Sequence, residues 1–150
     1  MHSATISSGA IRCAATIALC LAPVGIASAQ SGKWVASVQQ LKTGPGAADL
    51  SIDPRNDKQS RAKISFRNTQ RDMRIAWDIA PGRCGDNASG IASQATFTVV
   101  ITQMDGSGSA TANIPKLESG KLYYLRVFDP QSQPTDGVGS AGCANLSEKP

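Results

Sequence analysis

The stretch Arg74–Cys84 reads R-I-A-W-D-I-A-P-G-R-C and places an alternating strand, a Pro-Gly turn and a cysteine in direct succession. The side chains of a strand point alternately to its two faces, so apolar residues at every second position mark a buried face. The pattern predicts a core face with Met73, Ile75, Trp77 and Ile79 and an opposite face with Arg74, Ala76, Asp78 and Ala80. We therefore expect a strand that is buried on one side and ends in the turn before Cys84.

The same two-residue period recurs on both sides of this stretch, and no segment shows a helical period. Ala62, Ile64 and Phe66 alternate with charged and polar residues, and the segment Phe97–Met104 predicts a strand that ends in the hairpin turn D-G-S-G. Further alternating runs begin near Trp34, Leu50, Ala110, Leu122 and Cys143, the last of which is expected to form the final strand. Seven or eight short strands at intervals of roughly ten residues predict an all-β fold, an antiparallel β-sandwich of the Greek-key type.

The first 29 residues differ from the rest of the chain in charge and hydropathy. They contain one basic residue, Arg12, and no acidic residue, and their apolar run from Ala14 to Leu21 is too short to span a bilayer. Ala27-Ser28-Ala29 is a small-residue cleavage pattern, which predicts a signal peptide over residues 1–29 and a single domain over residues 30–150. A lipoprotein signal at Cys20 is the alternative, although the bulky Leu19 precedes that cysteine. We expect a periplasmic or secreted bacterial protein without a transmembrane segment after cleavage.

Removal of this segment leaves no histidine, because His2 is the only one in the chain. The remaining charge is 14 basic minus 11 acidic residues, or +3. Cys84 and Cys143 are the two cysteines that remain, and an isolated pair in an exported protein predicts a disulfide. Without histidine, a Ser-His-Asp or Cys-His arrangement cannot form, so these classes of nucleophilic catalysis are excluded.

Several segments together resemble a known family. The strand W-D-I-A-P-G-R-C, the small-residue loop after it, the hairpin D-G-S-G-S-A-T-A, the strand start L-E-S-G-K-L-Y-Y and the late G-C-A-N-L resemble copper/zinc superoxide dismutases. They are still more similar to chordin-type (CHRD) domains and related exported bacterial proteins. The resemblance covers roughly Leu50 to Leu146. It implies the sandwich fold and, independently of the compartment argument, the pairing of Cys84 with Cys143.

The resemblance also implies a departure from the enzyme. The metal-binding histidines of the dismutases would fall at Asp78 and Ala80 in this chain. Dismutation needs a copper ion held largely by imidazoles, and a carboxylate is a poor ligand for reduced copper. A shared fold does not imply a shared function. We therefore expect a sandwich without this metal chemistry and without a cofactor.

Asp78 is the carboxylate with two competing interpretations. Its place on the strand Arg74–Cys84 suggests a ligand contact or a weak metal contact. The alternative is a surface residue that pairs with a basic neighbour such as Arg74 or Lys63. Five aromatic residues fall on apolar alternating positions and are expected in the core: Trp34, Phe66, Trp77, Phe97 and Phe128. Tyr123 and Tyr124 must face opposite sides of one strand, so one of them should reach the surface or a hydrogen-bond partner.

Most of the positive charge lies between Asp53 and Arg74. Seven basic residues face three acidic ones there, and the basic residues are Arg55, Lys58, Arg61, Lys63, Arg67, Arg71 and Arg74. Arg61, Lys63, Arg67 and Arg74 are candidate contacts for an anionic envelope polymer or lipid headgroup. The alternative is a solvated sheet face whose charges protect an edge strand. Nucleic acid is not expected as a partner, because the chain is predicted to be exported and the segment lacks interleaved aromatic residues.

These patterns favour a non-enzymatic exported module that binds a partner or has a structural role. A metal-handling or dismutase-like enzyme is the first alternative, and a binder of anionic glycan or lipid is the second.

Overall fold

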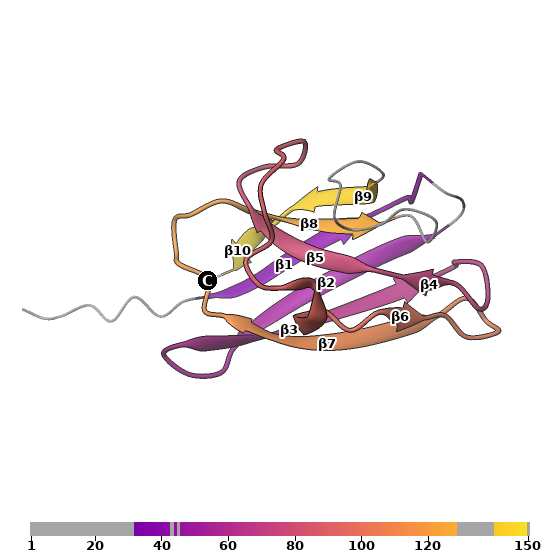
Figure 1. Cartoon of the computed structure of the whole chain (residues 1–150), viewed down its shortest axis with the longest axis horizontal. Coiled ribbons are helices and arrows are strands. Elements are labelled where there is room, and N and C mark those ends of the chain that lie inside the picture. Colours follow the sequence, from indigo (N-terminus) through magenta and orange to yellow (C-terminus); the bar gives the residue numbers. More distant parts are fainter. Residues whose placement is uncertain (1–31, 43, 45, 129–139, 150) are drawn as a thin grey trace, which may run out of the picture.

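The computed structural model describes residues 32–42, 44, 46–128 and 140–149, and there the chain forms antiparallel strands with one 3-10 helix (Figure 1). The predicted signal peptide and most of the predicted loop Asp129–Gly142 lie outside these residues. The elements are β1 (Lys33–Val38), β2 (Ala47–Pro54), β3 (Gln59–Arg67), β4 (Arg74–Ile75), β5 (Trp77–Pro81), η1 (Gln94–Thr96), β6 (Val100–Ile101), β7 (Gly108–Pro115), β8 (Tyr123–Phe128), β9 (Ser140–Asn145) and β10 (Ser147–Lys149). The predicted all-β class is confirmed. No helix in the described ranges is long and apolar enough to cross a membrane.

The first layer is a five-stranded sheet in the order β10-β1-β2-β3-β7. All neighbouring strands are antiparallel, and β3 pairs without interruption with β2 on one side and β7 on the other. The alternation predicted for β3 is confirmed, because Ala62, Ile64 and Phe66 are buried while Arg61 and Lys63 are exposed. β2 is longer than expected, because it begins at Ala47 rather than near Leu50.

The second layer is built from two small sheets that continue one another. One has the order β5-β8-β9, and the other pairs β4 with β6. Only Ala76 separates β4 from β5, and its carbonyl accepts a hydrogen bond from the Phe128 N–H at 2.9 Å. The strand predicted over Met73–Ala80 is therefore present with one interruption, and its two edges carry β6 and β8.

The core lies between the two layers and contains most of the predicted aromatic residues. Trp34, Phe66, Trp77 and Phe97 are buried there, and the ring centroids of Trp77 and Phe97 lie 5.0 Å apart. The Trp34 ring meets Tyr123 edge-on at 5.5 Å. Phe128 is equally buried but does not belong to this cluster, because it faces the other side of β8.

The strand predicted over Phe97–Met104 is wrong for most of its length. The 3-10 helix η1 lies just before this segment, and within the segment only Val100 and Ile101 form a strand, β6. Its buried residues are Phe97, Val100 and Thr102, so the two-residue period holds only from Val100 to Thr102. The Trp77 indole N–H donates to the Thr98 carbonyl at 2.9 Å, and the Gln94 amide donates to the Trp77 carbonyl at 3.3 Å. These bonds fasten the segment along β5 and override its alternating pattern.

The prediction that the strand at Cys143 is the last is also wrong. β9 begins earlier, at Ser140, and β10 follows it across one residue, Leu146. The sequence S-E-K of β10 has no apolar alternation from which a strand could be predicted. It is a strand because its backbone pairs with β1 from Lys33 to Val35.

Candidate functional site

The outer face of the β5-β8-β9 sheet carries a second buried cluster, separate from the core. Residues of β5 and β8 that point away from the core meet there, with Asp78 opposite Arg126 and Ala80 opposite Tyr124. Asp78 is 5 % exposed, and Ala80, Tyr124 and Phe128 are no more than 1 % exposed. This face is therefore a layer of packed side chains rather than a solvated surface.

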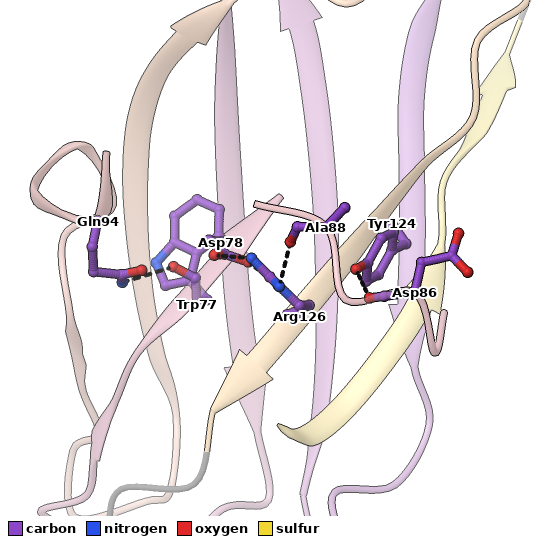
Figure 2. Close-up of polar contacts among 7 residues, drawn as sticks. All are labelled: Trp77, Asp78, Asp86, Ala88, Gln94, Tyr124 and Arg126. Atoms are coloured by element: carbon purple, nitrogen blue, oxygen red, sulfur yellow. Dashed lines mark hydrogen bonds and ion pairs between the residues drawn. The ribbon is translucent and has the colours of Figure 1, made fainter. Parts of the chain in front are cut away.

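An ion pair between Asp78 and Arg126 occupies the middle of the cluster (Figure 2). The Arg126 Nε donates to one carboxylate oxygen of Asp78 and Nη2 donates to the other, both at 2.7 Å. A two-pronged pair of this kind is the strongest arrangement of guanidinium and carboxylate. The hydrogen bond to Asp78 raises the pKa of Arg126 above its ordinary value, so the guanidinium stays charged. Both oxygens of Asp78 are engaged by the same partner.

Aromatic rings and a backbone carbonyl complete the surroundings of Arg126. Its Nη1 donates to the Ala88 carbonyl at 2.8 Å. The guanidinium carbon lies 5.8 Å from the ring centre of Tyr124 and 5.5 Å from that of Phe128, a distance at which cation–π attraction operates. These two residues precede and follow Arg126 by two positions on β8, so they share its face of the strand.

The loop of residues 82–93 covers this cluster. The Tyr124 hydroxyl donates to the Asp86 carbonyl, and the Ile91 N–H donates to the Ile79 carbonyl at 2.9 Å. The loop passes so close to the ion pair that a Cβ on Gly90 would lie 3.2 Å from a carboxylate oxygen of Asp78. The predicted small-residue loop is thus a cover for Asp78 and Arg126, and Gly90 allows the close approach.

The predicted disulfide between Cys84 and Cys143 is confirmed, with the two Cα atoms 5.8 Å apart. It joins the 82–93 loop to β9. The Cys84 N–H also donates to the Asn145 side-chain oxygen at 2.8 Å. The cover is therefore fixed to the sheet by a covalent bond at its start and by hydrogen bonds along its length.

The interpretation of Asp78 as a surface residue paired with Arg74 or Lys63 is wrong. The predicted side of the strand is right, but the 82–93 loop buries that side, and the partner is Arg126. Sequence reasoning missed Arg126, which sits in the run Y-Y-L-R-V-F. A charged residue within such an apolar run is a signal for a buried counter-charge, because unpaired charges are almost never buried.

Tyr123 and Tyr124 both form hydrogen bonds through their hydroxyl groups, and the sequence predicted this for one of them. The Tyr123 hydroxyl lies in the core layer and accepts a hydrogen bond from the Glu118 N–H at 3.2 Å. The Tyr124 hydroxyl reaches the 82–93 loop on the other side of the sheet. The two side chains therefore bind different elements from opposite faces of one strand.

A hollow of about 320 Å³ opens beside the disulfide. Lys42, Asp86 and Asn87 line it together with both cysteines, and Tyr124 and Arg126 form part of its wall. Charges of both signs meet there, and the functional groups of Tyr124 and Arg126 are already bonded to the protein. The two β8 side chains in its wall are therefore held by the 82–93 loop, and Lys42, Asp86 and Asn87 supply the other polar groups of the lining.

The basic candidates fall into two places. Arg61, Lys63 and Arg67 lie in a row on the outer face of β3, and Arg74 lies on β4 in the other layer. Lys33 lies on the same outer face as the β3 row, where it pairs with Asp53 at 3.4 Å, and Arg67 pairs with Asp49 at 3.3 Å. The four basic residues predicted to contact an anionic ligand therefore do not form one surface, because Arg74 lies in a different layer from the other three.

No group of three or more His, Cys, Asp or Glu side chains that could hold a metal ion occurs within the ranges that the structure describes. No protein-family model matches the sequence, and a search of curated proteins finds no significant match. The side chains described above are thus the basis for inferring a function.

Proposed function

We propose that the protein is an exported, non-enzymatic β-sandwich that serves as a binding or structural module in the bacterial periplasm or outside the cell. The signal-like segment 1–29 supports export. The disulfide supports it too, because disulfides persist in oxidising compartments and are rare in the cytosol. The two-layer strand arrangement and the position of the disulfide are consistent with the resemblance to the superoxide dismutases and chordin-type domains.

The observation that carries the proposal is the Asp78–Arg126 pair. The resemblance assigns the metal-binding histidines to Asp78 and Ala80. In this chain the first position is a carboxylate bonded on both oxygens to a guanidinium, and the second is a buried methyl group. A metal ion at this place would have to displace Arg126 and leave its charge buried without a partner, which costs several kcal/mol. The pair therefore supports a structural role for the position.

The test is metal analysis of the purified mature protein together with a dismutase assay. The protein is first incubated with excess Cu(II) and Zn(II) and then desalted, so that a vacant site has the opportunity to fill. We expect well under one metal ion per chain and no activity above a blank that contains the same free metal. One copper per chain with dismutase activity would overturn the proposal in favour of a metalloenzyme.

A second candidate is binding of an anionic envelope polymer or lipid headgroup through the outer face of the five-stranded sheet. Arg61, Lys63 and Arg67 alternate on β3 and all face solvent. Lys149 and Lys33 are cross-strand partners on the same face, and Asp49 and Asp53 are the two acidic residues there. Five basic against two acidic side chains leave this face at +3, which attracts polyanions over a range set by the salt concentration.

Co-sedimentation with lipopolysaccharide and with cell-wall fragments tests this candidate at low and high salt. The double variant Arg61→Gln/Lys63→Gln should lose several-fold in binding at low salt. The matched control Arg71→Gln/Arg74→Gln removes the same charge from other places and should lose less. Binding that is insensitive to salt, or equal losses in both variants, would exclude the outer face of the five-stranded sheet as the binding surface.

A further inference from the structure

The four edges of the two layers are not equally protected. An exposed edge strand presents unpaired N–H and C=O groups, and proteins shield such edges with short strands, charges or covering segments. β6 has two residues, and β10 has three, which include Glu148 and Lys149. The edge of β9 receives the Lys42 N–H at the Ala141 carbonyl at 2.7 Å and is joined to the 82–93 loop by the disulfide. Three edges are therefore short, charged or covered.

β7 is the exception. It has eight residues, G-S-A-T-A-N-I-P, without a charged side chain, and it pairs with β3 without a register shift. Every second residue of an antiparallel strand turns its N–H and C=O away from its neighbour. Between Ser109 and Pro115 these outward groups have no backbone partner among the described residues. Figure 1 shows β7 along the lower border of the molecule, with no strand beyond it.

Exposed apolar side chains gather in the segment that leads into β7. Four large hydrophobic residues are exposed in the described part of the chain, and three of them are Val99, Ile101 and Met104. Met104 is 81 % exposed. β6 touches the beginning of β7, since a Cβ on Gly108 would lie 2.7 Å from a methyl group of Val100. The open edge and the exposed apolar side chains therefore share one border of the sandwich, which is the pattern of an interaction site.

We propose that β7 pairs antiparallel with β7 of a second copy of this chain, so that five strands from each copy form one continuous sheet. The strand complements itself. A two-fold axis at Thr111 places Thr111 opposite Thr111 and Ser109 opposite Asn113, and hydroxyl and amide side chains opposite one another are favourable. No like charges meet across such a pair, and a two-fold axis closes the assembly at two copies.

The charges beside β7 set the expected salt dependence. Arg61 and Lys63 lie one strand inward, opposite Asn113 and Thr111. In the dimer, Arg61 and Lys63 of one copy are separated from the same residues of the other copy by three strand spacings, or about 14 Å. This distance exceeds the screening length of about 8 Å at physiological salt. Self-association should therefore strengthen slightly as salt is added. An acidic peptide at the same edge would bind more weakly in salt.

Sedimentation velocity of the mature chain over a range of concentrations tests the proposal. We expect a monomer–dimer equilibrium, and a dimer dissociation constant that rises roughly tenfold or more in Thr111→Lys, because two like charges then stand opposite each other across the axis. Ser147→Lys adds the same charge to β10, the opposite edge strand of the same sheet, and should leave the constant unchanged. Met104→Gln should weaken the dimer by a smaller factor.

Thermal melts followed by circular dichroism establish that each variant is folded, and Thr111 and Ser147 are both exposed. A chain that stays monomeric at every concentration would overturn the proposal, as would an equal effect of Thr111→Lys and Ser147→Lys. Self-association that weakens with salt would also contradict it. These outcomes are distinguishable from those of the metal and envelope-binding assays, because those assays change no residue of β7.

Discussion

The outer faces of the two layers have the same sequence pattern but differ in solvent exposure. On β3, Arg61, Lys63 and Arg67 alternate with core residues and remain in solvent. On β8, Arg126 alternates with core residues in the same way but is largely covered by the 82–93 loop. A charged residue at an outward position of a strand therefore does not establish an exposed face. Whether such a residue is exposed depends on whether another segment, here the 82–93 loop, covers that face.

The difference also changes what each charge contributes. The Lys33–Asp53 and Arg67–Asp49 pairs are about half exposed, and pairs of this kind contribute about 0–1 kcal/mol. The Asp78 and Arg126 side chains are only 7 % and 11 % exposed, so water screens this pair much less than the two pairs on the open face. Loss of one member on the covered face should therefore be far more costly than loss of a charge on the open face.

Removal of the disulfide should destabilise the protein more than any other change to the covered face, because it releases the 82–93 loop from β9. Cys84 and Cys143 are 59 positions apart, and closure of such a loop stabilises a folded chain by about 4 kcal/mol. We expect reduction, or the double variant Cys84→Ser/Cys143→Ser, to lower the melting temperature by more than about 10 °C. Calorimetry of protein that mass spectrometry shows to be oxidised provides the reference. An unchanged melting temperature would mean that the disulfide does not stabilise the fold.

Removal of the buried counter-charge is the next most costly change. Asp78→Asn keeps the shape of the side chain but leaves the Arg126 charge without its partner, which should lower the free energy of unfolding by about 3 kcal/mol. The control on the open face, Lys63→Met, should change it by less than about 0.5 kcal/mol. Urea denaturation measures both. Similar values for the two variants would show that the covered face is not a low-dielectric environment.

Replacement of both Asp78 and Arg126 distinguishes the contribution of the charge pair to stability from the contribution of side-chain packing. Asp78→Leu/Arg126→Met fills the space with apolar groups, and such exchanges are often neutral or stabilising. We expect a free energy of unfolding within about 1 kcal/mol of the wild type, well above that of Asp78→Asn. A double variant as unstable as the single one would show that the Ala88 and aromatic contacts of Arg126, and not its charge pair, stabilise the cluster.

A smaller effect is expected from the hydrogen bond that holds the middle of the cover. Tyr124→Phe removes the donor to the Asp86 carbonyl and should cost about 1 kcal/mol. Hydrogen exchange should become faster at the Ile91 amide, which bonds the loop to β5, and stay unchanged at the Thr69 amide, which bonds to Gly106 far from the cover. Faster exchange at both amides would indicate global destabilisation instead of local opening.

The smallest effect concerns a carboxylate outside the covered face. Hydrogen bonds from the Ser107 side chain and backbone lower the pKa of Asp105 below its ordinary value. Because the folded-state pKa is the lower one, this contribution is present above the ordinary pKa near 3.8 and is lost as the pH falls through the folded-state value. Asp105→Asn should therefore be slightly less stable than the wild type at neutral pH and equal to it in strong acid. A constant difference across the pH range would contradict this.

Much of the site could be predicted from the sequence. The features that could not be predicted all have the same cause. The disulfide, the two faces of β3 and the side of the strand on which Asp78 lies were predicted from compartment and period. The burial of Asp78, its pairing with Arg126 and the placement of Arg74 in the other layer were not. Each of these depends on residues that are distant in the sequence, since Asp78 and Arg126 are 48 positions apart.

The sequence by itself determined the all-β class, the cysteine pair and the inward side of the main strands, because side-chain alternation is a local property of an extended backbone. Only the tertiary structure decided which outward face is covered, that β10 becomes a strand and that Phe97–Ile101 does not extend as one. Those outcomes depend on which partner is nearby, through ladder pairing, a loop that crosses a sheet and a counter-charge that must be matched where water is excluded.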